Sequence, residues 1–272
     1  MRRRLSVQRV GQNPGPMGLS VIVITRNEAA NIDACVQSVS FADEIVVVDA
    51  GSRDDTVARA RSLGARVIET ADWPGFGRQK NRALDAATHD WVLSIDADER
   101  VSPELAASIR AVVAAAPGAD APAYALSRRS SFCGQWMRAS GWYPDPVMRL
   151  FARTRARFSD DQVHERVLFD GATRLLAGEL LHHSIPTLEN AIDKMNRYSS
   201  GRAHDLLARG RSGSLGRAVA HGLWAFIRTY VFKRGFLDGR LGFVLAVNNA
   251  EASYYRYLKM WLAARANGGQ WR

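Results

Sequence analysis

Residues 19–28 read LSVIVITRNE, an apolar run that ends in a polar tetrapeptide. Two later runs end in the same way: EIVVV at 44–48 is followed by DAGS at 49–52, and WVLSI at 91–95 is followed by DAD at 96–98. Short runs rich in Val and Ile predict buried strands. Segments with helical spacing separate them, so we expect parallel strands whose polar ends meet at one edge of a sheet, where open α/β sheets bind ligands.

The segments between these strands carry helix signals. Residues 28–39 place apolar side chains at helical spacing, and Ser52 is expected to cap a second helix with Asp54 and Asp55 in its first turn. A third strand at 65–68, a helix at 78–87 and a helix opened by Ser102-Pro103-Glu104 complete the alternation. The pattern predicts an α/β fold with a mostly parallel central sheet flanked by helices.

The pattern changes after Pro117. Short strands are expected at 124–128, 147–151 and 163–169, and the chain is expected to be helical from Thr187 onward. We therefore predict a basic, flexible arm at 1–18, an α/β domain at 19–186 and a helical, amphipathic extension at 187–272. Within the α/β domain, residues 19–116 form a first predicted half, which carries the strand-end motifs, and residues 117–186 form the second.

The net charge of +10 is uneven. Residues 1–18 carry four Arg and no acid, residues 19–188 carry 19 basic and 22 acidic groups, and residues 189–272 carry 14 basic and 5 acidic groups. A near-neutral core flanked by cationic segments predicts an anionic surface as partner, either a membrane leaflet or nucleic acid. The alternative is a solvated basic face. No apolar run approaches the ~20 residues of a membrane-spanning helix.

The triplet Asp96-Ala97-Asp98 follows a predicted buried strand near the middle of the sheet. Carboxylates at i and i+2 can point to one side of an extended chain. A hard divalent cation, Mg²⁺ or Mn²⁺, is held by such carboxylates together with the phosphates of a nucleotide. An Asp-x-Asp triplet alone is weak, because many surface loops contain one. Three polar motifs, each at the end of a predicted strand, are more readily explained by a shared ligand site than by chance.

In combination, SVIVITRNE, VVVDAGSRDDT and DADE resemble a family 2 glycosyltransferase. The resemblance implies a GT-A fold, a nucleotide-sugar donor and inversion at the anomeric carbon. Gln79-Lys80-Asn81-Arg82, Arg149-Leu150-Phe151 and Val163-His164-Glu165 further resemble β-glycosyltransferases of lipopolysaccharide core biosynthesis. Many family members have a second acid where Ala50 stands, which leaves Asp49 and Thr25 as the candidates for recognising the base.

The chemistry of transfer assigns roles to these positions. A diphosphate leaving group must be neutralised, and we expect Asp98 with Asp96 to hold the metal ion, with His164 as a further ligand. The alternative for His164 is a polar side chain beside a strand that is satisfied by hydrogen bonds and binds no metal. The residues expected to bind the donor are Thr25, Asn27, Glu28, Asp49, Ser52, Arg78, Lys80 and Asp96.

A carboxylate in the second half must accept the proton of the acceptor hydroxyl. The segment 160–165, Asp-Asp-Gln-Val-His-Glu, supplies three acids and a histidine. Glu165 is the preferred base, followed by Asp161 and then Asp145. Trp136, Trp142 and Tyr143 are candidates for stacking on a sugar, with core packing as the alternative.

We therefore expect an inverting, metal-dependent hexosyltransferase with a nucleotide-sugar donor, UDP-linked, and a glycolipid or saccharide acceptor. It is expected to be cytoplasmic and peripheral at the inner face of the cell membrane, with no nucleic acid as partner. A sugar nucleotidyltransferase is the first alternative, but it normally needs a glycine-rich basic loop where Thr25-Arg26-Asn27-Glu28 stands. A basic nucleic-acid-binding protein is the second, although no recognised binding motif is present. A dehydrogenase is disfavoured because no Gly-x-Gly-x-x-Gly follows a strand.

Overall fold

The computed structural model describes residues 18–118, 120–160 and 165–266. Except for Gly18, the predicted basic arm lies outside these residues. The strands are β1 Leu19–Thr25, β2 Glu44–Asp49, β3 Arg66–Glu69, β4 Trp91–Ser94, β5 Glu99–Val101, β6 Ala123–Phe132, β7 Gln135–Trp136, β8 Asp145–Ala152, β9 Ala156–Phe158, β10 Val167–Phe169 and β11 Thr173–Ile185. The helices are α1 Ile32–Ser38, α2 Thr56–Ser62, α3 Phe76–Ala86, α4 Pro103–Val113, α5 Leu188–Ala208, α6 Leu215–Ile227 and α7 Gly239–Ala266, with a π-helical turn η1 at Arg228–Phe232 and a 3₁₀ turn η2 at Gly235–Asp238.

The main sheet has the hydrogen-bonded order β3-β2-β1-β4-β8-β6-β11-β5, and β7 pairs with β6. The first four strands are parallel, as predicted, whereas β8 is antiparallel to β4 and β11 is antiparallel to β5. The sheet is therefore mixed. Thr25 lies opposite Asp49 in the β1–β2 register, so the polar ends of these two strands meet at the same edge.

The chain folds into two compact units that are not continuous in sequence. The first unit contains residues 1–97, 103–125 and 148–176, and the second contains residues 98–102, 126–147 and 177–272. The Asp96-Ala97-Asp98 triplet is thus a point where the chain passes from one unit to the other. The predicted boundaries at residues 116 and 186 divide the chain into continuous segments, and they stay a prediction.

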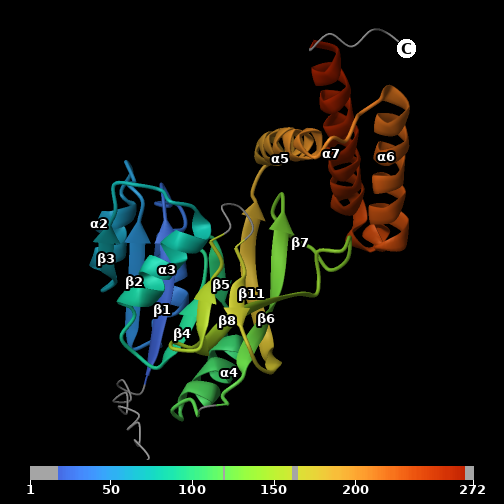
Figure 1. The fold of residues 1–272 in the computed structure, drawn as a ribbon. Coiled ribbons are helices and arrows are strands. Elements are labelled where there is room, and N and C mark those ends of the chain that lie inside the picture. The colour runs from blue at the N-terminus through green and yellow to red at the C-terminus, as the bar shows by residue number, and fades with distance from the viewer. Residues whose placement is uncertain (1–17, 119, 161–164, 267–272) are drawn as a thin grey trace, which may run out of the picture. The chain divides into compact units, whose positions relative to one another are not determined.

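Burial explains the parallel strands of the first unit. All seven residues of β1 and the last four of β2 are buried, so both faces of these strands are covered and the sequence lacks polar alternation. One hydrophobic cluster joins the strands to α3 and contains Ile22, Ile24, Val46, Val48, Ala83 and Leu84. The parallel strands β3, β2, β1 and β4 lie side by side (Figure 1). Helix packing on a β-branched sheet is what the alternating pattern predicted.

Capping residues mark where α5 and α6 of the second unit begin, and small residues let α6 pack against α7. Thr187 caps α5 by accepting a hydrogen bond from the Asn190 N–H, and Ser214 caps α6 through the Arg217 N–H. The buried residues of α6 are the small Ala218, Gly222 and Ala225, which allow α7 to pack closely beside it (Figure 1). Helices are therefore present after Thr187, as predicted, but the apolar Leu215, Val219 and Leu223 of α6 are exposed.

One local prediction is wrong, and one long strand was not predicted. Ser52 does not cap a helix, because α2 begins at Thr56 with Asp55 at its N-cap, and the Ser52 hydroxyl donates to Asp49 instead. The 13-residue strand β11 was not anticipated, because exposed and half-buried residues dominate it and leave no apolar run. The predicted strand at 163–169 is described from residue 165 and forms β10 at Val167–Phe169.

Among residues 18–118, 120–160 and 165–266, no helix is both long and apolar enough to cross a membrane.

Candidate active site

Asp49 organises the loops that follow β1 and β2. It is almost completely buried, and its Oδ2 accepts hydrogen bonds from Thr25 Oγ1 at 2.8 Å and from Ser52 Oγ at 2.5 Å. Its Oδ1 accepts from the Ser52 N–H at 2.8 Å. Three of the predicted donor-site residues, Thr25, Asp49 and Ser52, are therefore brought into direct contact.

Asn27 and Glu28 extend the same loop system. Asn27 has φ of 58°, a left-handed conformation that Asn tolerates better than most residues. Its N–H donates to Ser52 Oγ and its Oδ1 accepts from the Arg53 N–H, both at 2.8 Å. The Glu28 N–H donates to Thr56 Oγ1, also at 2.8 Å. The two strand-end motifs thus form one hydrogen-bonded edge, which is exposed at Asn27.

Lys80 is the centre of a buried charge network in the first unit. Only 3% of its side chain is exposed, and its Nζ lies 2.9 Å from Asp96 Oδ1 and 2.7 Å from Glu165 Oε1. Arg149, also buried, lies 2.8 Å from Asp96 Oδ2. Two cations and two carboxylates alternate along Glu165–Lys80–Asp96–Arg149, so these four charges cancel.

Helix α3 is fixed so that Lys80 reaches both acids. Asn81 pairs with the backbone of Phe158 through two hydrogen bonds, Nδ2 to O at 2.9 Å and N–H to Oδ1 at 3.0 Å. The Gln79 amide donates to Thr70 Oγ1 at 3.0 Å. Gly77 meets the Ser159 carbonyl so closely that an added Cβ would lie 1.7 Å from its oxygen. Any larger residue at 77 would push the helix away from the strand.

The network sets the protonation of Asp96. Burial would by itself raise the pKa of this carboxyl, but the charges of Arg149 and Lys80 and their hydrogen bonds outweigh burial and hold the pKa well below its ordinary value. Asp96 is therefore ionised throughout the physiological range, and both its oxygens are engaged by cations. Lys80 and Arg149 therefore keep Asp96 in its anionic form.

Asp98 lies in the second unit beside a histidine that the sequence did not single out. His182 Nε2 is 3.2 Å from Asp98 Oδ2, and its Nδ1 lies 2.9 Å from Ser130 Oγ. The Ser130 hydroxyl orients the ring so that Nε2 faces the carboxylate. The His183 N–H donates to the Asp98 carbonyl at 2.9 Å, which fixes the backbone of Asp98 against β11.

This arrangement fits a divalent cation. A carboxylate oxygen and an imidazole nitrogen are suitable ligands for Mn²⁺, and a metal-bound histidine normally has its other nitrogen hydrogen-bonded, as Ser130 provides. The described residues contain no group of three or more His, Cys, Asp or Glu arranged for a metal ion. Other coordination positions would be available to the phosphates of a donor and to water.

The other predicted residues lie as follows. Arg78 is exposed and its Nη2 is 3.9 Å from Asp160 Oδ2. Asp161 and His164 lie outside the described residues. Asp145 pairs with Arg128 at 2.7 Å. Trp142 packs against Phe132 in the core of the second unit, and Trp136 contacts the ring of His183.

Two site residues were missed. Arg149 belongs to the motif Arg149-Leu150-Phe151, but an arginine in an otherwise apolar strand carries no signal of its partner. His182 had a weak signal, the adjacent pair His182-His183, which nothing in the sequence connects with Asp98.

The comparisons with known proteins place the chain in a family. A model of glycosyl transferase family 2 matches residues 20–172. A glycosyltransferase of Rickettsia typhi is 33% identical over 252 residues, which cover 89% of this chain and 86% of that protein. The chain belongs to glycosyl transferase family 2. A family 2 protein with this α/β sheet is a glycosyltransferase of the GT-A type, as predicted, and not a nucleotidyltransferase or a non-enzymatic nucleic-acid-binding protein.

Two further similarities concern named proteins. The lipopolysaccharide core biosynthesis glycosyltransferase LpsC of Rhizobium meliloti is 29% identical over 268 residues, covering 92% of this chain and 95% of its own. The structure of a mannosyltransferase from Pyrobaculum calidifontis, in complex with GDP-Man and Mn²⁺, superposes with a TM-score of 0.47 at 17% identity, over 95% of this chain and 79% of that one.

The ionised state of Asp96 predicts a pH-dependent stability. Its folded-state pKa is depressed, so the network stabilises the fold above the unfolded-state pKa of about 3.9 and loses this contribution as the pH falls below that value. Asp96→Asn should lower the free energy of unfolding by about 2 kcal/mol at pH 7, a value reduced for partial exposure. Urea unfolding from pH 7 to pH 3 should show the difference from wild type shrinking on acidification. The exposed Asp170→Asn is the control, and a difference that stays constant with pH would contradict this account.

Proposed function

We propose that this glycosyltransferase transfers a hexose, with inversion, from a UDP-linked nucleotide sugar to a glycolipid acceptor of the lipopolysaccharide core, using a divalent cation. The observation that carries the metal dependence is the Asp98–His182 contact of 3.2 Å with Ser130 behind the imidazole. The similarity to LpsC over nearly the whole of both chains supports the acceptor class.

The donor is proposed to bind the strand-end loops, Arg78 and a bound metal ion. A bound Mg²⁺ or Mn²⁺ ion, with Asp98 and His182 as its protein ligands, would neutralise the charge of the diphosphate leaving group. Thr25, Asn27, Glu28, Asp49 and Ser52 form the hydrogen-bonded edge where the nucleoside binds. Arg78 is exposed and adds a donor to the phosphates.

Glu165 is the proposed base. Its Oε1 accepts from Lys80 Nζ at 2.7 Å, and its side chain is 19% exposed, so the carboxylate is fixed while still accessible. Among the described residues its other oxygen has no hydrogen-bond partner, and this oxygen is proposed to accept the proton of the acceptor hydroxyl. Lys80 keeps the base oriented, and Asp96 keeps Lys80 in place. Asp161 is the second candidate for the base.

The acceptor is proposed to be reached at the cytoplasmic face of a membrane. In the second unit, Trp224, Phe232, Phe236 and Phe243 are about half exposed or more, beside the exposed basic residues Arg228, Lys233, Arg234 and Arg240. Aromatic and basic residues on one helical segment suit the interface of an anionic leaflet. Peripheral binding there would bring the enzyme to a lipid-linked acceptor.

The metal assignment predicts a difference between two neighbouring histidines. Asp98→Asn should lower the rate of transfer at least ~10³-fold with the fold intact, because a charged ligand is lost from the leaving-group site. His182→Ala should weaken Mn²⁺-dependent binding of the donor about 10–100-fold. His183→Ala, whose ring packs on Trp136, is the matched control and should bind the donor normally. A transfer assay measures the first effect, and titration calorimetry with a panel of nucleotide sugars, with and without Mn²⁺, measures the second. Equal losses of donor binding for the two histidines would refute the assignment.

The base assignment separates binding from transfer. Glu165→Gln keeps an acceptor for Lys80 but cannot take up a proton, so it should bind the donor normally and lose transfer by at least ~10²-fold. Donor affinity and single-turnover transfer are measured on the same preparation. Asp161→Asn is the comparison, and if it is inactive while Glu165→Gln is active, the two roles are exchanged.

The membrane proposal predicts salt-sensitive binding to anionic vesicles. Each basic group near the surface contributes about 1 kcal/mol, so neutralising Lys233, Arg234 and Arg240 should weaken vesicle binding about 150-fold. Flotation with anionic vesicles in low and high salt measures this. The matched control changes the exposed Arg26, Arg53 and Arg174 of the first unit to Gln. Equal binding to neutral and anionic vesicles, or equal effects of the two triple variants, would remove this role.

A further inference from the structure

The turn between α5 and α6 has a fixed backbone. Gly210 has φ of +70°, its N–H donates to the Leu207 carbonyl, and the Arg211 N–H donates to the Leu206 carbonyl, both at 2.9 Å. This pair of hydrogen bonds is the Schellman motif, in which the residue after the glycine turns back over the last helical turn. Ser214 then caps α6. The turn therefore directs Arg211 back toward Leu206.

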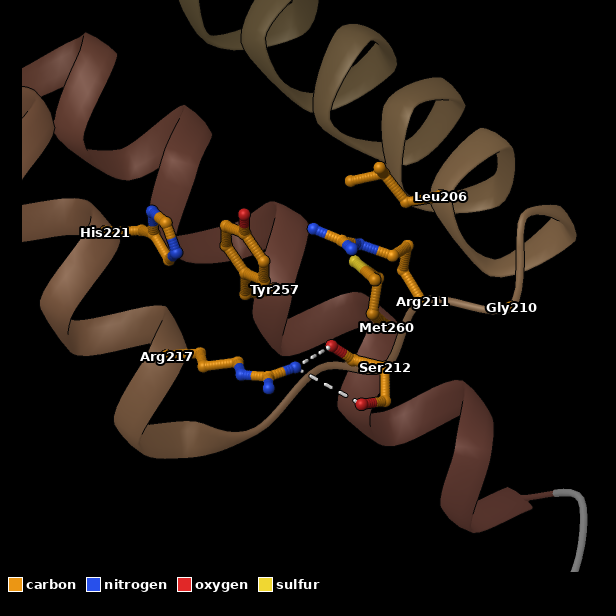
Figure 2. Close-up of a pocket in the computed structure, with 8 residues that line it drawn as sticks. All are labelled: Leu206, Gly210, Arg211, Ser212, Arg217, His221, Tyr257 and Met260. Atoms are coloured by element: carbon orange, nitrogen blue, oxygen red, sulfur yellow. Dashed lines mark hydrogen bonds between the residues drawn. The ribbon is translucent and has the colours of Figure 1, made fainter.

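A cavity of about 490 Å³ opens at this turn, within the second unit. Its lining combines two guanidinium groups, an imidazole, a hydroxyl and a phenol with two apolar side chains, and no acid contributes to it (Figure 2). The lining residues are Leu206, Gly210, Arg211, Ser212, Arg217, His221, Tyr257 and Met260. The volume is within the range of small-molecule sites, about 300–1,000 Å³.

The polar groups of the lining are held in place. Arg217 Nη1 donates to the Ser212 carbonyl at 2.9 Å and lies 3.3 Å from Ser212 Oγ, which fixes the guanidinium across the turn (Figure 2). His221 stacks on Tyr257 with ring centroids 4.2 Å apart and an angle of 12° between the planes. Within the described residues, no carboxylate pairs with Arg211 or Arg217.

A further cation of the second unit is Arg256 on α7. Arg256, the residue before Tyr257, is half-buried, and its Nε is a buried atom without a hydrogen-bond partner among the described residues. Burial lowers the pKa of Arg256, Tyr257 opposes this shift, and the charges of Arg202 and Arg228 add to it. The first turn of α6 adds the positive end of a helix dipole.

We propose that this cavity binds the phosphate group of a phosphate monoester. A phosphate dianion offers three terminal oxygens, which match the guanidinium groups of Arg211 and Arg217 and the imidazole of His221. Leu206 and Met260 provide an apolar surface for the carbon side of the ester. The same chemistry is found in a phosphorylated lipid headgroup and in a soluble phosphorylated saccharide. This site does not depend on the proposed transfer reaction.

The test uses the full chain and reads the site directly. The imidazole resonances of His221, assigned with His221→Gln, are followed by NMR during titration with inorganic phosphate or glucose 6-phosphate at constant pH and ionic strength. A saturable shift is expected. Arg211→Gln removes one charge-assisted contact and should weaken binding about tenfold. Arg211 is exposed, so this change leaves the fold intact, and Arg211→Lys should retain part of the affinity. Arg174→Gln, an exposed arginine of the first unit, should bind as wild type does.

A vesicle arm separates the two sources of phosphate. Phosphatidylcholine vesicles containing phosphatidic acid, a monoester, are compared with vesicles containing phosphatidylglycerol, a diester, by flotation of wild type and Arg211→Gln. Arg211-dependent preference for phosphatidic acid assigns the site to a lipid headgroup, and a response to the soluble esters assigns it to a soluble ligand; either supports the proposal. The proposal is overturned if sodium chloride shifts His221 as phosphate does, if Arg211→Gln matches wild type in both arms, or if neither arm detects binding. None of these readouts requires glycosyl transfer, so failure here and failure of the proposed function are distinguishable.

Discussion

A buried ammonium group constrains the first unit more than any other interaction. Lys80 is 3% exposed, and a cation removed from water in this way is tolerated only with opposite charge in direct contact. Asp96 and Glu165 supply that charge from the end of β4 and from the segment before β10, 16 and 85 positions away in sequence. Arg149 of β8 then balances Asp96. Asn81 fixes α3 to the backbone of Phe158, and the lack of a side chain at Gly77 lets α3 approach Ser159 closely. Both features keep Lys80 within reach of its two carboxylates.

The parallel half of the sheet could be predicted closely, because local signals and burial agree there. β1 begins and ends where the apolar run does, and β2 extends one residue beyond the prediction to include Asp49. Prediction failed where the local pattern has another explanation. Ser52 has the composition of a helix cap, but the buried Asp49 carboxylate competes for its hydroxyl and backbone N–H. β11 has partners in the sheet without a continuous apolar face, so no period in its sequence identifies it.

For the candidate site, the sequence indicates which residues gather but not what each one contacts. The strand-end motifs correctly bring Thr25, Asp49 and Ser52 together, since register alone places them at one edge. The pairing of Asp96 with Lys80 and Arg149 depends on α3 and β8 approaching the same strand end, which is a tertiary property. His182 faces Asp98 for the same kind of reason: β11 pairs with β5, and His182 is opposite Glu99 in that register.

Helix α6 illustrates how one segment carries two surfaces. Its buried stripe consists of Ala218, Gly222 and Ala225, and an added Cβ at Gly222 would lie 3.2 Å from the Cβ of Tyr254 on α7. Because small residues make this stripe narrow, most of the helix circumference is left over. Arg217 and His221, four residues apart, line the cavity on one side, whereas Leu215, Val219 and Leu223 recur on a different face and stay exposed. Composition records only a cationic segment with apolar residues, whereas helical geometry places the basic residues at the cavity and the apolar residues on a separate, exposed surface.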